Sequence, residues 1–266
     1  MSFSISGKTA IVTGAANGIG LAIARHFADR GANVMFADMD DARLADELGD
    51  IEDDSNIRYF SGDLREKLTI ANLLSGTIDA FETVDILVNG SRQMLTTSPL
   101  DADDDSMDIL LQQNLLTSFR LSQLVARRMI KQAEGREDGT AGSIINLSSI
   151  AARRAHADLL AYSVSTAALE QMTRSMAVSL APNRIRVNAV AFGSVMSESL
   201  KETLRGNREF RETIEQNTPL GRIAAPQELG DALQFLASDG SGFVTGQVLT
   251  VDGGRSLLDV AATPAH

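Results

Sequence analysis

Three glycines lie in the stretch of this chain with the clearest chemistry. Gly14, Gly18 and Gly20 follow a short apolar run at residues 9–12. Apolar side chains then recur at helical spacing over residues 21–28, so the pattern predicts a buried strand, a tight turn and a helix. Glycine in such a turn lets the backbone approach a ligand closely. The unpaired N–H groups and the dipole of the first helical turn stabilise a pyrophosphate.

An acidic residue at the end of the next strand restricts the kind of ligand that this turn could bind. Asp38 closes a second apolar run at residues 33–37, where a carboxylate accepts hydrogen bonds from ribose hydroxyls. The spacing Gly-x-x-x-Gly-x-Gly differs from the commoner Gly-x-Gly-x-x-Gly. With a strand before it, a helix after it and an acid at the next strand end, the turn favours a dinucleotide site. The alternative is a glycine turn that only permits close packing.

Composition bounds the remaining possibilities. The 266 residues, 44% hydrophobic and 22% charged, fit one globular α/β domain with a sizeable core. The absence of cysteine excludes disulfides and thiolate catalysis, and the three scattered histidines predict no metal site. A formal charge of −11 disfavours nucleic-acid and anionic-membrane partners. With no apolar run of ~18 residues and no signal-peptide pattern, we expect a cytoplasmic protein that does not bind or span membranes.

Strands and helices alternate along the whole chain. This order predicts a single-domain, Rossmann-like, doubly wound parallel sheet of about seven strands, with helices on both faces. We expect residues 196–216 to form a helical flap over the substrate and residues 260–266 to be a loose tail. Further strands are expected at 56–60, 84–88, 142–147, 184–190 and 247–251, and further helices at 41–50, 66–82, 103–133, 161–180 and 226–237.

Along nearly its whole length the chain resembles the short-chain dehydrogenase/reductase family. Thr13–Gly20 is similar to that family's cofactor turn, and Val251–Gly254 is similar to its C-terminal signature. Ser149 and Tyr162, thirteen positions apart, match its serine and tyrosine. The resemblance implies an NAD(H)-dependent oxidoreductase that interconverts a small alcohol and its ketone or aldehyde. It also implies a homo-oligomer, either a tetramer or a dimer.

The resemblance assigns roles to particular residues. Tyr162 is expected as the acid/base, Ser149 as the group that holds the substrate oxygen, and Asn114 as a support of the catalytic site. No residue is expected to bind a metal. The residues expected to bind NAD are Gly14, Asn17, Gly18, Ile19, Gly20, Asp38, Asp63, Leu64, Asn89, Tyr162, Thr166, Gly193 and Val195.

One departure from the family pattern affects the expected chemistry most. A tyrosine, with an ordinary pKa of about 10, is a poor base at neutral pH. The family places a lysine four residues after its tyrosine, where the cation lowers the phenol pKa, binds the ribose and relays the proton. This chain has Thr166 at that position. We therefore expect slow or reduction-biased activity. The alternative is a catalytically impaired NAD-binding protein that acts as a sensor or as a silent subunit of an oligomer.

Two further departures lie near the expected nicotinamide position. The family's Asn-Asn-Ala-Gly is Asn89-Gly-Ser-Arg92 here, and its Pro-Gly is Phe192-Gly193. Arg92, Arg153 and Arg154 flank the expected pocket in sequence, so each is a candidate for the missing positive charge. The alternative for each is an ordinary surface arginine.

Overall fold

The structure, a computed structural model, describes residues 3–49, 55–136 and 138–259. The seven strands in these ranges are all parallel and lie in the order β3-β2-β1-β4-β5-β6-β7. This confirms the predicted fold class. The tail expected at residues 260–266 lies outside the described residues. The strands are β1 (Thr9–Thr13), β2 (Asn33–Asp38), β3 (Ile57–Ser61), β4 (Ile86–Asn89), β5 (Gly142–Ser149), β6 (Ile185–Phe192) and β7 (Val248–Val251).

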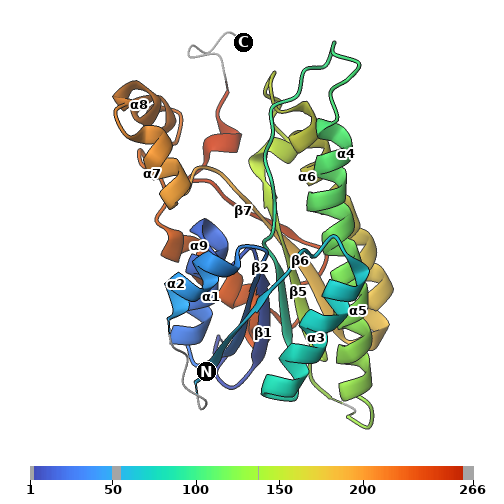
Figure 1. The fold of residues 1–266 in the computed structure, drawn as a ribbon. Coiled ribbons are helices and arrows are strands. Elements are labelled where there is room, and N and C mark those ends of the chain that lie inside the picture. Colours follow the sequence, from blue (N-terminus) through green and yellow to red (C-terminus); the bar gives the residue numbers. More distant parts are fainter. Residues whose placement is uncertain (1–2, 50–54, 137, 260–266) are drawn as a thin grey trace.

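Helices cover both faces of the sheet because its central strands are apolar on both sides. In β1, Ala10 and Val12 face one hydrophobic layer while Ile11 faces the other. Helices α1 (Gly18–Asp29), α2 (Asp41–Leu48) and α9 (Pro226–Ala237) pack on the first layer. Helices α3 (Lys67–Phe81), α5 (Thr117–Gln132) and α6 (Leu160–Leu180) pack on the second (Figure 1). None of the helices in the described ranges is long and apolar enough to cross a membrane.

The long helix expected at 103–133 begins later and is not uniform. It consists of α4 (Ser106–Leu110), a π-helical stretch at Leu111–Leu116, and α5. The Thr117 hydroxyl donates to the Gln112 carbonyl at 2.9 Å, five residues back, as the wider turn allows. Hydrophobic spacing cannot reveal such a change of pitch, and Asn114 lies within it.

Two short helices occupy the predicted flap at 196–216. They are α7 (Glu198–Leu204) and α8 (Arg208–Gln216), separated at Gly206, which has a φ of +80°. The Ser197 hydroxyl caps α7 by accepting the Leu200 N–H. A Cβ built on Gly18 would lie 3.8 Å from the Ser197 Cβ, so the segment starts beside the glycine turn. Its role in covering a substrate stays a prediction.

The glycine turn lies at the point where the strand order reverses, between β1 and β4. A doubly wound sheet binds its ligands outside the strand ends at this point. Gly14 has a φ of +72°, and a Cβ on Gly20 would lie 2.0 Å from the Gly14 carbonyl oxygen. A Cβ on Gly14 would lie 2.8 Å from the Gly90 carbonyl oxygen. Three backbone segments therefore meet with no room for side chains.

This geometry predicts opposite effects for two glycine-to-alanine changes. Gly20→Ala must push backbone segments apart, so we expect a loss of stability well above the value of about 1 kcal/mol that is typical of point mutants. Gly76→Ala, in the interior of α3 with open space at its Cβ position, should stabilise by about 0.5–1 kcal/mol. Urea unfolding of both variants measures these changes. Equal effects of the two substitutions would contradict the close packing of the turn.

Candidate active site

The turn after β1 and the end of β2 form one polar surface suited to a dinucleotide. Asp38 Oδ2 accepts the Ala16 N–H at 3.1 Å, and Oδ1 accepts the Met39 and Asp40 N–H groups at 2.7 and 3.1 Å. A carboxylate has about four acceptor positions, so one stays available to a ribose hydroxyl. The first bond of α1 runs from the Leu21 N–H to the Asn17 carbonyl, which leaves the preceding N–H groups to a pyrophosphate. These donors and acceptors fit the pyrophosphate and ribose of a dinucleotide.

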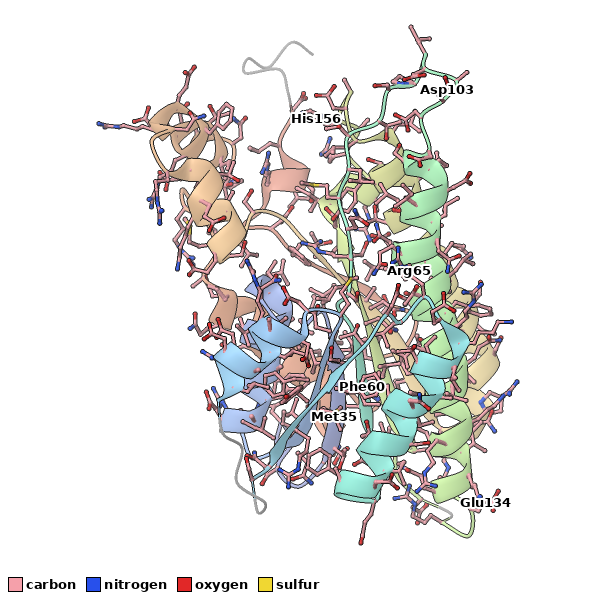
Figure 2. All side chains as sticks on the ribbon, viewed as in Figure 1. Met35, Phe60, Arg65, Asp103, Glu134 and His156 are labelled. Carbon is pink, nitrogen blue, oxygen red and sulfur yellow. The ribbon has the colours of Figure 1, made fainter. Side chains whose placement is uncertain are left out.

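Asp63 and Leu64 follow β3, beside the N-terminus of α3. The Arg65 guanidinium donates hydrogen bonds to both carboxylate oxygens of Asp63, with nitrogen–oxygen distances of 2.6–3.0 Å. This pairing with Arg65 lowers the pKa of Asp63 below its usual value. The neighbouring Leu64 is buried, whereas the side chain of Arg65 can be located in Figure 2. An adenine contact at Asp63 stays a prediction, and it would share the carboxylate with Arg65.

Asn89 lies at the end of β4, but its side chain is part of the core. Its Nδ2 donates to Ser122 Oγ at 2.9 Å and to Asn146 Oδ1 at 2.8 Å. Asn146 Nδ2 in turn donates to Thr173 Oγ1 at 2.8 Å. This buried network ties β4 and β5 to helices α5 and α6. The side chain of Asn89 thus has a structural role here, and its contact with a cofactor is untested.

The turn after β6 packs against the end of β7. The Gly193 N–H donates to the Val251 carbonyl at 3.2 Å, and a Cβ on Gly193 would lie 3.1 Å from the Asp252 Cβ. Val195 is buried and forms an isolated parallel bridge with Ala224. Gly193 and Val195 therefore lie at the same carboxyl edge of the sheet as the glycine turn.

Ser149 and Tyr162 reach this edge from β5 and α6. Tyr162 is only 4% exposed and packs with Leu110 and Ala161. Ser149 is the last residue of β5, and its hydroxyl accepts the Ala151 N–H at 3.1 Å. The short helical turn that follows, Ile150–Ala152, packs against α6. In Figure 2, His156 marks this end of the molecule and Glu134 the opposite end.

Thr166 does not take the place of the family's lysine. Its single hydroxyl proton is shared between the carbonyl oxygens of Tyr162, at 2.8 Å, and Ser163, at 3.1 Å, within its own helix. The side chain is buried and uncharged. The hydroxyl is therefore used to close the helical turn, and the expected contact of Thr166 with a cofactor stays a prediction.

The structure separates the three arginine candidates. Arg92 Nη1 donates to the Tyr162 hydroxyl at 2.9 Å. Arg153 instead pairs with Glu170 at 3.2 Å, and Arg154 donates to the Ser256 carbonyl. The Arg92 guanidinium also lies 4.2 Å from the centre of the Phe192 ring. Two of the positions that depart from the family pattern, 92 and 192, are thus in contact, which the sequence alone did not reveal.

Asn114, in the π-helical stretch, holds the chain next to Arg92. Its Oδ1 accepts the Gln93 N–H at 2.8 Å, and its Nδ2 donates to the Gln93 carbonyl at 2.9 Å and to Ser165 Oγ at 3.2 Å. Three hydrogen bonds therefore occupy the amide. They anchor the chain at Gln93, whereas the role of Asn114 in the catalytic site stays a prediction.

Similarity to known proteins covers almost the whole chain. A family model described as enoyl-(acyl carrier protein) reductase matches residues 14–256. The 7alpha-hydroxysteroid dehydrogenase of Escherichia coli (strain K12) is 33% identical over 94% of this chain and 94% of its own. The 3-oxoacyl-(acyl-carrier-protein) reductase FabG of Thermotoga maritima is 32% identical over 94% of this chain and 98% of its own.

Solved structures agree with these relatives. One is a 7 alpha-hydroxysteroid dehydrogenase complexed with NADH and 7-oxo glycochenodeoxycholic acid. It aligns with a TM-score of 0.83 at 32% identity, over 95% of this chain and 96% of that one. A short-chain type dehydrogenase/reductase from Mycobacterium marinum aligns with a TM-score of 0.82 at 29% identity, over 96% and 97%. The chain belongs to the short-chain dehydrogenase/reductase family of oxidoreductases, which bind a nicotinamide cofactor.

Proposed function

We propose that this oxidoreductase uses NAD(H) to interconvert a small alcohol and its ketone or aldehyde. The observation that carries the proposal is the meeting of three features at one edge of the sheet. They are the glycine turn with Asp38, the Tyr162 hydroxyl with its cationic neighbour, and Ser149 at the end of β5. A related 7 alpha-hydroxysteroid dehydrogenase binds NADH and a 7-oxo compound, which supports carbonyl chemistry at this edge.

Each group has a defined task in carbonyl reduction. The nicotinamide, when bound, supplies the hydride that becomes the new C–H bond. Tyr162 donates its phenolic proton to the carbonyl oxygen, so one O–H bond breaks as another forms, and solvent then returns a proton to the phenolate. The Ser149 hydroxyl holds the same oxygen, and Asp38 and the N–H groups of the turn orient the cofactor. Oxidation reverses each step.

We also propose a homo-oligomer, a dimer or tetramer. Apolar side chains are exposed on the outer sides of two neighbouring helical runs, with Leu116 and Phe119 on one and Leu160 and Val164 on the other. Exposed apolar groups of this size favour association, and closed two-fold symmetry is the commonest arrangement.

Association is tested by light scattering. At micromolar concentration we expect twice or four times the mass of one chain. The mass of a single chain would contradict the oligomer, and with it any role as the subunit of a homo-oligomer.

Asp38 predicts the choice between NAD(H) and NADP(H). A 2′-phosphate beside this carboxylate is repelled, so we expect NAD(H) to bind at least about tenfold more tightly, or about 1.4 kcal/mol. Asp38→Ala should reduce this preference. Asp41→Ala, which removes an exposed carboxylate from the start of α2, should not. Calorimetry with both cofactors measures the preference. Equal or tighter binding of NADP(H) by the unmodified chain would overturn the assignment.

Removal of the Tyr162 hydroxyl tests the chemistry. Tyr162→Phe should lower turnover by at least the 10²-fold typical of a lost acid/base group, with NADH affinity changed much less. Tyr59→Phe, on the other tyrosine and 39% exposed, serves as the matched control and should keep full activity. The measurement is a screen of alcohols and carbonyls with cofactor binding in parallel. An unmodified chain that binds NAD(H) and is inert on every substrate would instead favour the sensor or silent-subunit role.

A further inference from the structure

We propose that Arg92 supplies the positive charge that stabilises the Tyr162 phenolate, in place of the lysine that the family carries at the position of Thr166. The inference rests on the proposed function, because it assigns Tyr162 the acid/base role. It goes further by naming a cation from a different part of the chain. It also removes the reason for expecting slow or reduction-biased chemistry from Thr166 alone.

The direction of the hydrogen bond supports this role. A guanidinium has donors and no acceptor, so the Tyr162 oxygen must accept from Arg92 Nη1 at 2.9 Å. The phenolic proton then remains available to a substrate oxygen. A cation this close stabilises the charged form of the phenol relative to the neutral form.

Arg92 is held in place from both sides. The N–H groups of Gly90 and Ser91 both donate to Thr13 Oγ1 at 3.0 Å. On the other side, Asn114 fixes both backbone groups of Gln93. The side chain lies against the face of Phe192, where a cation is attracted to the ring. Residue 92 therefore lies between two anchored peptide groups, unlike an ordinary surface arginine.

Other charged groups near Tyr162 are paired or lie on the outside. Farther along α6, Glu170 pairs with Arg153 at 3.2 Å and with Arg174 at 3.4 Å. Before α6, His156 and Asp158 lie 3.8 Å apart on the surface. Asp108 is in α4, which also packs against α6, and its side chain is exposed. Within residues 3–49, 55–136 and 138–259, the cation in contact with the phenol is Arg92.

The charge has a defined place in alcohol oxidation. The Tyr162 phenolate takes the hydroxyl proton of the alcohol as the hydride leaves carbon for NAD⁺, giving the ketone, NADH and a neutral phenol. Arg92 stays protonated throughout, so it stabilises the phenolate and does not relay the proton. The neutral phenol then passes its proton to water. Arg92 thus performs only the electrostatic part of the lysine's task, and not its part in proton relay.

The chain's composition gives a direct test of this role in the cofactor-free protein. It has two tyrosines and no tryptophan, so in a Tyr59→Phe background the near-ultraviolet tyrosinate absorbance reports on Tyr162 alone. The test compares this background with the variants Arg92→Gln and Arg92→Met. Both introduce a neutral side chain, so that a folding defect in one variant leaves the other usable. Arg92→Lys keeps the charge. Arg154→Gln removes a neighbouring arginine that contacts the Ser256 carbonyl instead.

In the neutral variants we expect tyrosinate absorbance to rise at a higher pH than in the background, because the phenolate has lost its neighbouring cation. Arg92→Lys should recover most of this shift, and Arg154→Gln should show none. The acidic limb of kcat/KM for oxidation should move in the same direction. Unchanged titration in both neutral variants, or an equal shift in Arg154→Gln, would overturn the inference. A shift without turnover on any substrate would leave the Arg92 assignment standing and contradict the proposed reaction.

Discussion

The close approach of three backbone segments, around Gly14, Gly20 and Gly90, fixes the geometry on which the site depends. The Gly14 carbonyl fills the space that a Cβ at position 20 would need. The Gly90 carbonyl likewise fills the space that a Cβ at position 14 would need. This contact sets where helix α1 begins relative to β1, and so where its free N–H groups lie. It also places the end of β4 against the same turn. Because Arg92 follows Gly90 by two residues, the groups that would hold the cofactor and the cation beside Tyr162 are attached to the same closely packed backbone segments.

Most of the fold could be predicted from the sequence because it depends on burial over many residues. Central strands of a parallel sheet are apolar on both faces, so their runs are visible at 9–12 and 33–37, and the structure has strands at both. The π-helical stretch at Leu111–Leu116 and the break at Gly206 were not predicted. Each depends on the backbone geometry of a few residues. Hydrophobic periodicity is read over ten or more residues, so it does not detect such a local change.

The candidate site was predictable in its residue types but not in its contacts. The spacing of Ser149 and Tyr162 pointed to the pair, and Thr166 revealed the missing lysine. Sequence could not choose among Arg92, Arg153 and Arg154, because a side chain's direction depends on tertiary packing. Arg153 pairs with Glu170 on α6, while Arg92 reaches Tyr162.

The departures from the family pattern compensate for one another in space. Arg92 replaces a glycine of the family pattern, and Phe192 replaces a proline and receives the Arg92 guanidinium. Thr166 replaces the lysine and turns its hydroxyl back to the helix. Together these changes move the positive charge at Tyr162 from α6 to the loop after β4. The loss of the lysine is therefore not by itself a sign of lost catalysis.

A double-mutant cycle between positions 92 and 166, read out as the rate of alcohol oxidation, tests this exchange of charge most directly. If Arg92 supplies the lysine's charge, Thr166→Lys should raise the rate at least about tenfold in the Arg92→Gln background, because the new ammonium group restores the cation that stabilises the phenolate. With Arg92 intact, the same substitution should change the rate by less than about threefold. Equal gains in the two backgrounds would show that positions 92 and 166 act independently, which would contradict the role given to Arg92.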